Sequence, residues 1–505
     1  MSTSPATGRG RLSADREALL AQYLAGLVED SQRITPLWPG AARPLSFAQQ
    51  RLWFLDRLQP GGAEYNASIV LRLTGRLDTP ALRQALGAVV ARHEVLRTTI
   101  TTSPEGVATQ TVHPPACLAL PCVDVSELPG GNGAAGAVEL VRRLIEADVW
   151  RSFDLARDVP LRARLVRLAA DEHVLAIAVH HIAFDEWSQE ILHRELWTQY
   201  AAFQGGAPAT LAPPPIQYAD YAAWQREWLA GDVLERELDY WRAQLADLRP
   251  VTPSSGRGAV TPSSGRGAGE LPADRPREAA LDEPGAVLAF EVPPATTAAL
   301  NALARQARAS LFMVLLAACQ VWLARHTGQP DVVIGTPVAN RAHPDTQHVV
   351  GLFVNTLVLR SDVSGDPTFG ELLASVRRTA LDAYAHQELP FERLVDALQP
   401  QRDRTRTPLF QVMLAVHPEQ PPDDDGGLGG LGVCNFPIGR TAAKFDLAIN
   451  VHESRGALHG SIAYHTGLFD AATVERLAER LTTLLAAIAD DPSRRLRDLP
   501  VLTPA

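Results

Sequence analysis

A pair of histidines followed by a carboxylate is the part of the sequence best suited to chemistry. His180 and His181 come at the end of an apolar run, and Asp185 follows four residues after His181. An imidazole, with a pKa of about 6.5, can accept a proton from an attacking amine or alcohol near neutral pH. The pair therefore offers a candidate general base. Asp185 is spaced to fold back onto the loop or to pair with a distant cation.

The same residues also fit a purely structural interpretation. Two histidines whose ring nitrogens are hydrogen-bonded in a core turn would give this pattern. A spacing of four between a histidine and an aspartate also has many accidental matches. From these residues alone, the structural and the catalytic interpretations both remain open.

A strand and a helix are expected to position this cluster. Residues 174–179 predict a buried strand that ends at the histidines, and residues 187–203 predict the helix that follows. Strand ends are where α/β folds present catalytic groups. Strands and helices alternate elsewhere too, which predicts an α/β fold. The other expected strands are 68–74, 96–102, 332–338 and 353–359, and the other expected helices are 12–31, 79–93, 136–152, 296–307 and 309–324.

The chain divides into two comparable halves. Residues 34–44 are a proline-rich tether, so the folded body is expected to begin near Leu45. The sequence VTPSSGRGA occurs twice in succession, at 251–259 and 260–268, and such a repeat is expected to be a mobile surface insertion. The expected division is an N-terminal linker at 1–44, an N-terminal lobe at 45–230, a crossover with the repeat at 231–280, and a C-terminal lobe with an exit linker at 281–505.

Composition disfavours several classes of function. The 57 acidic side chains outnumber the 47 basic ones, for a net charge of −10, and no dense basic block is present, which argues against nucleic-acid binding. The polar residues 1–11 predict no signal peptide, and the longest apolar stretch, 309–324, is shorter than a membrane span. Four unevenly spaced cysteines indicate a reducing cytoplasm. Cys117 and Cys122 with His113 lack a fourth ligand, so no metal site is expected.

Seven short motifs are spread in order over almost the whole predicted folded body. In chain order they are SFAQQRLWFL at 46–55, RHEVLRT at 92–98, HHIAFDE at 180–186, YADYAAW at 218–224, GLFVNT at 351–356, HQELPFE at 386–392, and Arg402-Asp403 with Pro408-Leu409. They resemble the signature motifs of condensation domains of nonribosomal peptide synthetases, whose histidine motif is HHxxxDG. The chain is identified as a member of this family.

The resemblance implies an α/β, V-shaped pseudodimer of two chloramphenicol-acetyltransferase-like lobes, with an active-site tunnel between them. Donor and acceptor carrier proteins would insert their phosphopantetheine arms from opposite faces. The domain would join the donor's aminoacyl or peptidyl thioester to the amine of an acceptor aminoacyl thioester. The resemblance makes His181 the catalytic residue, as a general base or as a group that positions the amine. His180 and Asp185 would shape the loop, and Arg341 would pair with Asp185.

One residue departs from the family pattern, because Glu186 stands where the motif usually has glycine. A carboxylate beside His181 could hold a protonated histidine, contact a cationic substrate amine, or narrow the tunnel through a salt bridge that opens on loading. Alternatively, it points to solvent at the start of a helix. We hypothesise that Glu186 faces the tunnel and influences substrate access, with Trp187, Ser188 and Asn355 as further tunnel residues. The side chains of Trp53, Trp187, Trp224 and Trp228 are expected to be core anchors rather than ligand platforms.

The same motifs disfavour related activities. Heterocyclisation domains carry a DxxxxD pattern in place of the histidines, and epimerisation domains have different flanking signatures. The resemblance therefore favours the LCL subtype, which joins an L-configured donor to an L-configured acceptor. A non-catalytic platform that recruits a tailoring enzyme is the alternative from another class. Such platforms typically lose the second histidine, which is intact here.

The ends of the chain indicate a piece of a larger synthetase. Residues 12–31 resemble the segment after a carrier domain, 496–504 resemble the run towards an adenylation domain, and no carrier or adenylation signature lies between them. The carrier proteins would then be supplied in trans. The domain is expected to be a monomer that itself binds no metal or cofactor, and to act in the cytoplasm in the biosynthesis of an antibiotic or siderophore. Residues 444–447, KFDL, resemble the stretch that bridges the two lobes.

Overall fold

The computed structural model describes residues 33–127, 134–248, 271–277, 285–398, 407–417, 430–438 and 444–500. The helices are α2 (Phe47–Leu58), α3 (Thr79–Arg92), α4 (Ala134–Val149), α5 (Glu186–Gln204), α6 (Tyr218–Trp228), α7 (Gly231–Gln244), α8 (Pro294–Gln306), α9 (Leu311–Thr327), α10 (Phe369–Ala385), α11 (Phe391–Leu398) and α12 (Ala471–Asp490). The strands are β1 (Asn66–Thr74), β2 (Thr98–Thr102), β3 (Ala108–Val112), β4 (Cys122–Asp124), β5 (Leu161–Ala169), β6 (Glu172–His180), β7 (Gly285–Val292), β8 (Asp331–Val338), β9 (Asn355–Asp362), β10 (Val412–His417), β11 (Gly432–Asn435), β12 (Leu447–Ser454) and β13 (Ala457–His465).

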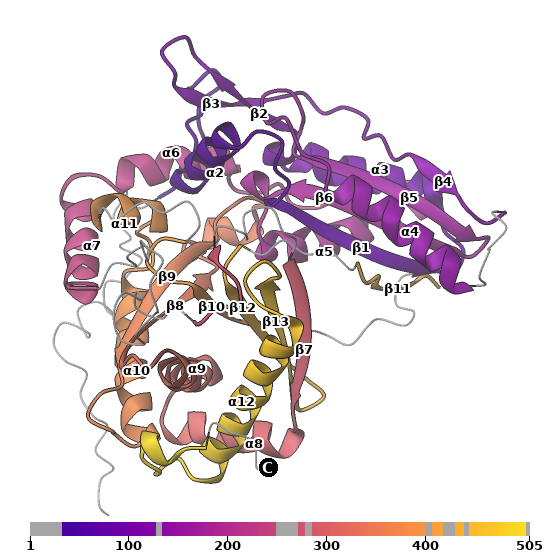
Figure 1. Cartoon of the computed structure of the whole chain (residues 1–505). Coiled ribbons are helices and arrows are strands. Elements are labelled where there is room, and N and C mark those ends of the chain that lie inside the picture. Colours follow the sequence, from indigo (N-terminus) through magenta and orange to yellow (C-terminus); the bar gives the residue numbers. More distant parts are fainter. Residues whose placement is uncertain are drawn as a thin grey trace, which may run out of the picture.

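Two lobes, each built on a mixed α/β layer, meet at an angle (Figure 1). The N-terminal lobe contains a five-stranded sheet in the order β11-β1-β6-β5-β4, and α4 packs against β1, β5 and β6. The C-terminal lobe contains a six-stranded sheet in the order β7-β13-β12-β10-β8-β9. Helices α8, α9, α10 and α12 pack with one another against this sheet, while α2, α6 and α11 lie near the junction of the lobes (Figure 1). The predicted α/β architecture is confirmed.

Helix α9 is the central element of the C-terminal core. Its N-terminus is capped by Ser310, whose hydroxyl accepts the Met313 N–H, and it ends at Gly328 in the left-handed conformation with φ of 71°. The helix is buried along most of its length, as predicted for the apolar stretch 309–324. In the described part of the chain, no single helix could span a membrane. Among the described helices, α8 and α9 taken together are long and apolar enough for a span, but the chain bends by 106° between them.

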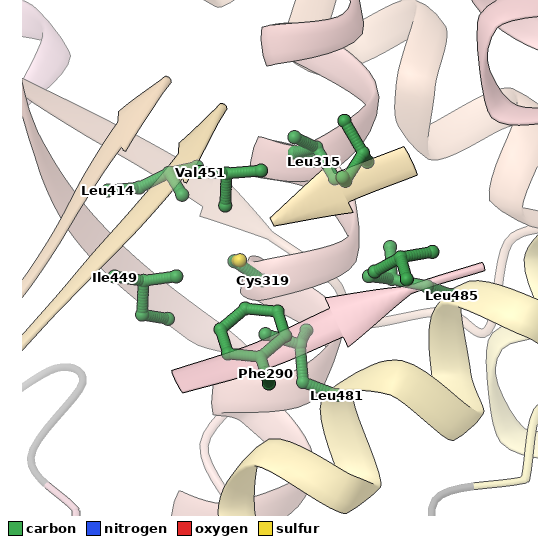
Figure 2. Close-up of a pocket in the computed structure, with 10 residues that line it drawn as sticks. Phe290, Leu315, Cys319, Leu414, Ile449, Val451, Leu481 and Leu485 are labelled. Carbon is green, nitrogen blue, oxygen red and sulfur yellow. The ribbon is translucent and has the colours of Figure 1, made fainter. Parts of the chain in front are cut away.

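A small cavity of about 10 Å³ lies in the C-terminal core beside α9 (Figure 2). Its lining carries no polar surface, so it is expected to stay dry. It belongs to the C-terminal core, whereas His181 belongs to the N-terminal lobe. The residues lining it are Phe290, Val292, Leu315, Cys319, Leu414, Ile449, Val451, Leu458, Leu481 and Leu485.

The lobes exchange segments of chain. Strand β11, from the C-terminal half, adds to the N-terminal sheet by pairing antiparallel with β1, with Leu71 opposite Asn435. Residues 349–353 from the C-terminal half also contribute buried side chains to the N-terminal core. In the other direction, Leu229 at the end of the N-terminal lobe joins the C-terminal core, and α7 of the crossover packs Trp241 into the same core. The two cores are therefore tied together by chain that crosses between them.

The proline-rich segment 34–44 differs from its predicted role as a tether. Ile34 is only 2% exposed and belongs to the N-terminal core. The Leu37 N–H donates to Asp220, and Pro44 forms a bridge with Thr109. The folded body therefore includes residues before Leu45, because a proline-rich segment can dock in extended form without regular structure of its own.

Local boundaries also differ from the sequence predictions. The strand predicted at 96–102 begins only at Thr98, because Glu94–Arg97 form a 3₁₀ turn. The Thr98 hydroxyl donates to the Glu94 carbonyl at 2.7 Å and stabilises this turn. The helix predicted at 12–31 and the repeat at 251–268 lie outside the described residues.

Candidate active site

Strand β6 holds the histidine pair at the end of a rigid element. It lies between β1 and β5, and its residues from His173 to His180 are all buried. After His180 the chain turns through a single 3₁₀ turn, His181–Ala183, and then enters α5. The His181 N–H donates to the Tyr65 carbonyl at 2.7 Å. The His181 carbonyl accepts the Phe184 N–H at 3.1 Å, so the backbone of His181 is held on both sides.

The His181 ring is held in one tautomer. Its Nδ1 lies 2.6 Å from the Phe184 carbonyl oxygen, which can only accept, so Nδ1 carries the proton. The Nε2 lone pair is therefore free to accept a hydrogen bond. Burial, and next the positive charge of Lys444, lower the pKa of His181 to about 3. The imidazole is neutral at pH 7, although the residue keeps some exposure to solvent.

His180 has a structural environment. Its Nδ1 accepts the Ile182 N–H at 3.1 Å, and its ring lies edge-to-face with Phe153, with centroids 6.0 Å apart. Burial is the main reason why the pKa of His180 is lowered to about 4. With Nδ1 used as an acceptor inside the turn, His180 stabilises the loop that presents His181.

Asp185 is the centre of a buried network that joins the lobes. As the N-cap of α5, it accepts the Ser188 N–H at 2.8 Å. The ion pair expected with Arg341 is present at 3.0 Å, and both side chains are 2% exposed. Asp185 also accepts the Phe353 N–H at 2.9 Å. A carboxylate buried this deeply is stable only because its oxygens are saturated by donors.

Arg341 extends the same network into the C-terminal half. Its guanidinium donates to the Val349 carbonyl at 2.7 Å and to the Ser188 hydroxyl at 3.1 Å. It also lies over the Phe353 ring, 4.0 Å from the centroid. Burial lowers the pKa of Arg341, and Asp185 opposes this effect. Arg341 therefore ties the segment that precedes β9 to the start of α5.

The structure separates the four residues predicted to line a tunnel. Glu186 and Trp187 are exposed, with 66% of the Glu186 side chain accessible and Trp187 44% exposed. Ser188 is fully buried in the Asp185 network. Asn355 is buried too, and its amide donates to the Leu389 carbonyl at 2.7 Å and accepts the Phe391 N–H. Ser188 and Asn355 thus use their polar atoms internally, which holds loops in place.

Trp187 is not the core anchor that the sequence predicted. Its indole N–H donates to the Gln347 carbonyl at 3.1 Å, so the ring spans from α5 to a loop of the C-terminal half. Trp187 is the second residue of α5, which begins at the boundary between the lobes, and one face of its side chain is left uncovered there. The ring is available for contact with another molecule.

Two charged residues beside this loop were not predicted as site residues. Lys444, the only lysine of the chain, places its Nζ 5.4 Å from the Tyr65 ring centroid. Its side chain reaches solvent, but the surrounding protein is the main reason why the pKa of Lys444 is lowered to about 8. His417, at the end of β10, lies 2.7 Å from Glu186. The KFDL resemblance indicated lobe bridging at Lys444, whereas no pattern in the sequence singled out His417.

The comparison with known families decides which family this chain belongs to. Residues 41–505 match the family model described as the condensation domain. The chain belongs to the condensation-domain family. Condensation domains of nonribosomal peptide synthetases form amide bonds by acyl transfer, so the predicted family and reaction class are confirmed.

Relatives of this condensation domain are parts of long synthetases. It is 42% identical to a linear gramicidin synthase polypeptide from Brevibacillus parabrevis, over 96% of this chain but only 6% of that protein. It is 40% identical to phosphinothricin tripeptide synthetase PhsC of Streptomyces viridochromogenes, over 91% of this chain and 40% of the relative. The chain thus spans a small part of the curated relatives it matches.

Solved structures share the whole fold. The X-domain from teicoplanin biosynthesis matches with a TM-score of 0.80 at 31% identity, covering 93% of this chain and 100% of the X-domain. The first condensation domain of the calcium-dependent antibiotic synthetase, in complex with a substrate analogue, matches with a TM-score of 0.72 at 24% identity, covering 92% of this chain and 100% of that domain. The latter likeness shows the two-lobed condensation-domain fold.

Proposed function

We propose that this condensation domain joins two carrier-bound substrates in nonribosomal peptide synthesis. The donor is an aminoacyl or peptidyl thioester, the acceptor is the amine of an aminoacyl thioester, and both are carried on phosphopantetheine arms in a tunnel between the lobes. The observation that carries the proposal is the free Nε2 lone pair of His181, held in a fixed tautomer beside the joint of the two lobes.

His181 is best suited to position the amine. A neutral imidazole whose pKa is about 3 is a weak base, but its Nε2 can still accept a hydrogen bond from the attacking amine. The nitrogen then attacks the thioester carbonyl, the C–S bond breaks, and the departing thiol takes the proton that the amine loses. Because a thioester is already activated, much of the rate can come from holding both substrates together, worth up to ~7–11 kcal/mol in favourable cases.

The other residues either hold the His181 loop in place or lie exposed beside it. Asp185 and Arg341 hold the His181 loop against the C-terminal half, and His180 holds the turn from inside. We assign Glu186 and Trp187, which are exposed, to the substrate path. Ser188 and Asn355 act on that path only through the loops that they hold.

The partners follow from the relatives. Donor and acceptor peptidyl carrier proteins and a flanking adenylation domain are the expected partners, since the relatives that this chain matches are far longer than the domain. We propose a monomeric domain of the LCL subtype. The four cysteines are unpaired in the structure, which is usual in a reducing compartment, and we propose the cytoplasm.

A recruitment platform is the second candidate. The likeness to the teicoplanin X-domain, which has been solved in complex with OxyB, favours it, at 31% identity over 94% of this chain. The intact His181 with its free Nε2 favours catalysis instead. A platform would need a docking surface but would not need this tautomer.

Mass spectrometry of the carriers separates the two candidates. Wild type and His181→Ala are incubated with a panel of aminoacyl donor and acceptor carriers, and dipeptidyl carrier is quantified. We expect the variant to lose about 10²- to 10⁴-fold in rate while its thermal unfolding stays unchanged. Equal product from the variant would overturn the role of His181. Carriers that bind to the wild type without any product across the panel would support the platform.

A further inference from the structure

The pair formed by Glu186 and His417 joins the two lobes beside the His181 loop. Glu186 is the first residue of α5 in the N-terminal lobe, and His417 is the last residue of β10 in the C-terminal lobe. The Glu186 Oε1 lies 2.7 Å from the His417 Nδ1. The Glu186 side chain is 66% exposed and that of His417 is 22% exposed. The contact is therefore open to solvent on the Glu186 side.

The groups that face the His417 ring favour its cationic form. A carboxylate oxygen only accepts, so the Nδ1 that faces Glu186 carries a proton. On the other side, the His417 Nε2 lies 3.4 Å from the Asn450 Oδ1, an acceptor as well. With an acceptor beside each ring nitrogen, the surroundings of His417 favour the imidazolium form. In agreement, Glu186 is the main reason why the pKa of His417 is raised.

Among the residues that the structure describes, the groups around His417 other than Glu186 carry no negative charge that could pair with it. From β12, His452 stands in register beside His417, and its ring is stacked on His459 of β13, with centroids 5.6 Å apart. Both neighbours are histidines, so they offer no negative charge. Among the charged groups described around His417, Glu186 from α5 is the one that holds an ion pair with it.

Glu186 and its neighbour Asp185 are used very differently. Asp185 is buried and accepts from Arg341, Ser188 and the backbone, so none of its charge is available. Glu186 is exposed, and its one described ion-pair partner can give up its proton. A carboxylate of this kind can change partners at low cost, because an exposed ion pair is worth only about 0–1 kcal/mol.

We propose that Glu186 is the docking point for the α-ammonium group of the acceptor, and that His417 is the resident cation that this ammonium displaces. The inference rests on the proposed function. An α-amino group has a pKa of about 7.7–8.0, so the acceptor arrives largely as an ammonium ion at pH 7. Exchanging one cation for another keeps Glu186 paired while the acceptor nitrogen is brought to the loop that carries His181.

The test compares two acceptor carriers that differ only in this charge. One carries a glycyl group and the other a glycolyl group, each on a non-hydrolysable amide analogue of the pantetheine arm, and binding to the domain is measured by calorimetry at pH 7. We expect the wild type to bind the glycyl carrier about 2- to 5-fold more tightly than the glycolyl carrier. Binding through the carrier protein itself is common to both probes and cancels in the ratio.

Two substitutions and one control show which residues cause the preference for the glycyl carrier over the glycolyl carrier. In Glu186→Gln we expect the preference for the glycyl carrier to disappear. Glu190→Gln removes the same charge from an exposed position one turn further along α5 and should keep the wild-type ratio. His417→Gln removes the competing cation, so glycyl binding should tighten while glycolyl binding stays the same.

The outcomes separate this inference from the proposed function. If Glu186→Gln keeps the wild-type preference, or if His417→Gln weakens glycyl binding, the docking role is wrong. If wild type makes dipeptidyl carrier but binds both probes equally, the docking role fails and the proposed function stands. If neither probe binds and no product forms, the proposed function fails, and this inference fails with it.

Discussion

At the scale of single residues, His181 shows how one local contact selects the chemistry. The Phe184 carbonyl fixes the proton on Nδ1, and burial keeps the ring uncharged. A ring in this state can orient an amine through Nε2 over the whole physiological pH range. The proton balance of the reaction is then governed by the substrate amine rather than by the histidine.

The pH dependence of condensation should reflect this. Between pH 5 and 8, His181 stays neutral because its pKa is about 3, so we expect no inflection near the usual histidine value. The single-turnover rate should instead rise as the acceptor amine loses its proton, near about pH 7.7–8.0. Quenched-flow rates at saturating carrier concentrations measure this profile.

An acceptor with a more acidic amine provides the control. A β-fluorinated amino acid on the same carrier should move the inflection to lower pH, because the inflection belongs to the substrate. An inflection near pH 6.5 that stays in place with both acceptors would instead assign the titration to the enzyme and contradict a neutral His181.

At the scale of elements, the joint between α5 and the segment before β9 depends on one buried ion pair. Asp185 and Arg341 are both buried, and each also has a hydrogen-bond partner in the other half of the chain, the Phe353 N–H for Asp185 and the Ser188 hydroxyl for Arg341. Removing one partner of such a pair leaves an uncompensated charge in the interior. The joint is therefore sensitive to single substitutions.

Replacing Asp185 with asparagine should lower the free energy of unfolding by about 3–5 kcal/mol. Asparagine is also a good N-cap, so the start of α5 is preserved and the loss reports mainly the unpaired Arg341. Urea unfolding followed by circular dichroism measures this change. Asp239→Asn, at an exposed pair with Arg242, should cost less than about 1 kcal/mol. Equal losses at both sites would contradict a buried, energetically distinct joint.

A glycine in the same joint is required by a close approach. The Tyr218 hydroxyl donates to the Leu352 carbonyl at 2.6 Å and also lies 2.8 Å from the Ser46 hydroxyl, which fixes its ring against Gly351. A methyl group at Gly351 would overlap this ring. Neither the backbone nor a doubly hydrogen-bonded tyrosine can move away easily.

Gly351→Ala should therefore destabilise the protein by about 1–3 kcal/mol. Gly87 lies inside α3 with open space around it, so Gly87→Ala should stabilise by about 0.5–1 kcal/mol through helix propensity. Thermal unfolding of wild type and of both variants shows whether each substitution stabilises or destabilises the protein. A neutral Gly351→Ala would show that the Tyr218 ring can shift.

At the scale of the whole molecule, two separate cores are joined by exchanged chain segments. The C-terminal core encloses Cys319 beside a small cavity, as Figure 2 shows, and burial raises the pKa of the Cys319 thiol to about 12. Cys117 and Cys122 are exposed on the N-terminal lobe. The thiols therefore report on different parts of the molecule.

Alkylation with iodoacetamide should divide the cysteines by position. Cys117 should react within minutes in native buffer, and Cys122 more slowly because burial, and next Asp124, raise the pKa of its thiol. Cys319 should react only at urea concentrations that open the C-terminal core. Peptide mass spectrometry identifies the labelled sites, with a fully unfolded sample as the reference for intrinsic reactivity. Native labelling of Cys319 at the rate of Cys117 would show that this core opens on its own.

Much of the fold and the central residue of the site could be predicted from the sequence. Motifs and hydrophobic periodicity are local, so β6, α5 and the loop that carries His181 were found within a few residues of their observed bounds. The resemblance supplied Arg341 as the partner of Asp185, a contact now seen at 3.0 Å. The family assignment needed no knowledge of the packing.

Only the tertiary structure decided which distant groups meet. It placed His417 opposite Glu186 and Lys444 beside Tyr65, and it put Ser188 into an internal network. It also docked the segment 34–44 on the folded body. The physical reason is that contacts across the lobe boundary depend on the direction of each side chain and on how two sheets and their connecting segments pack. Local pattern does not encode either of these.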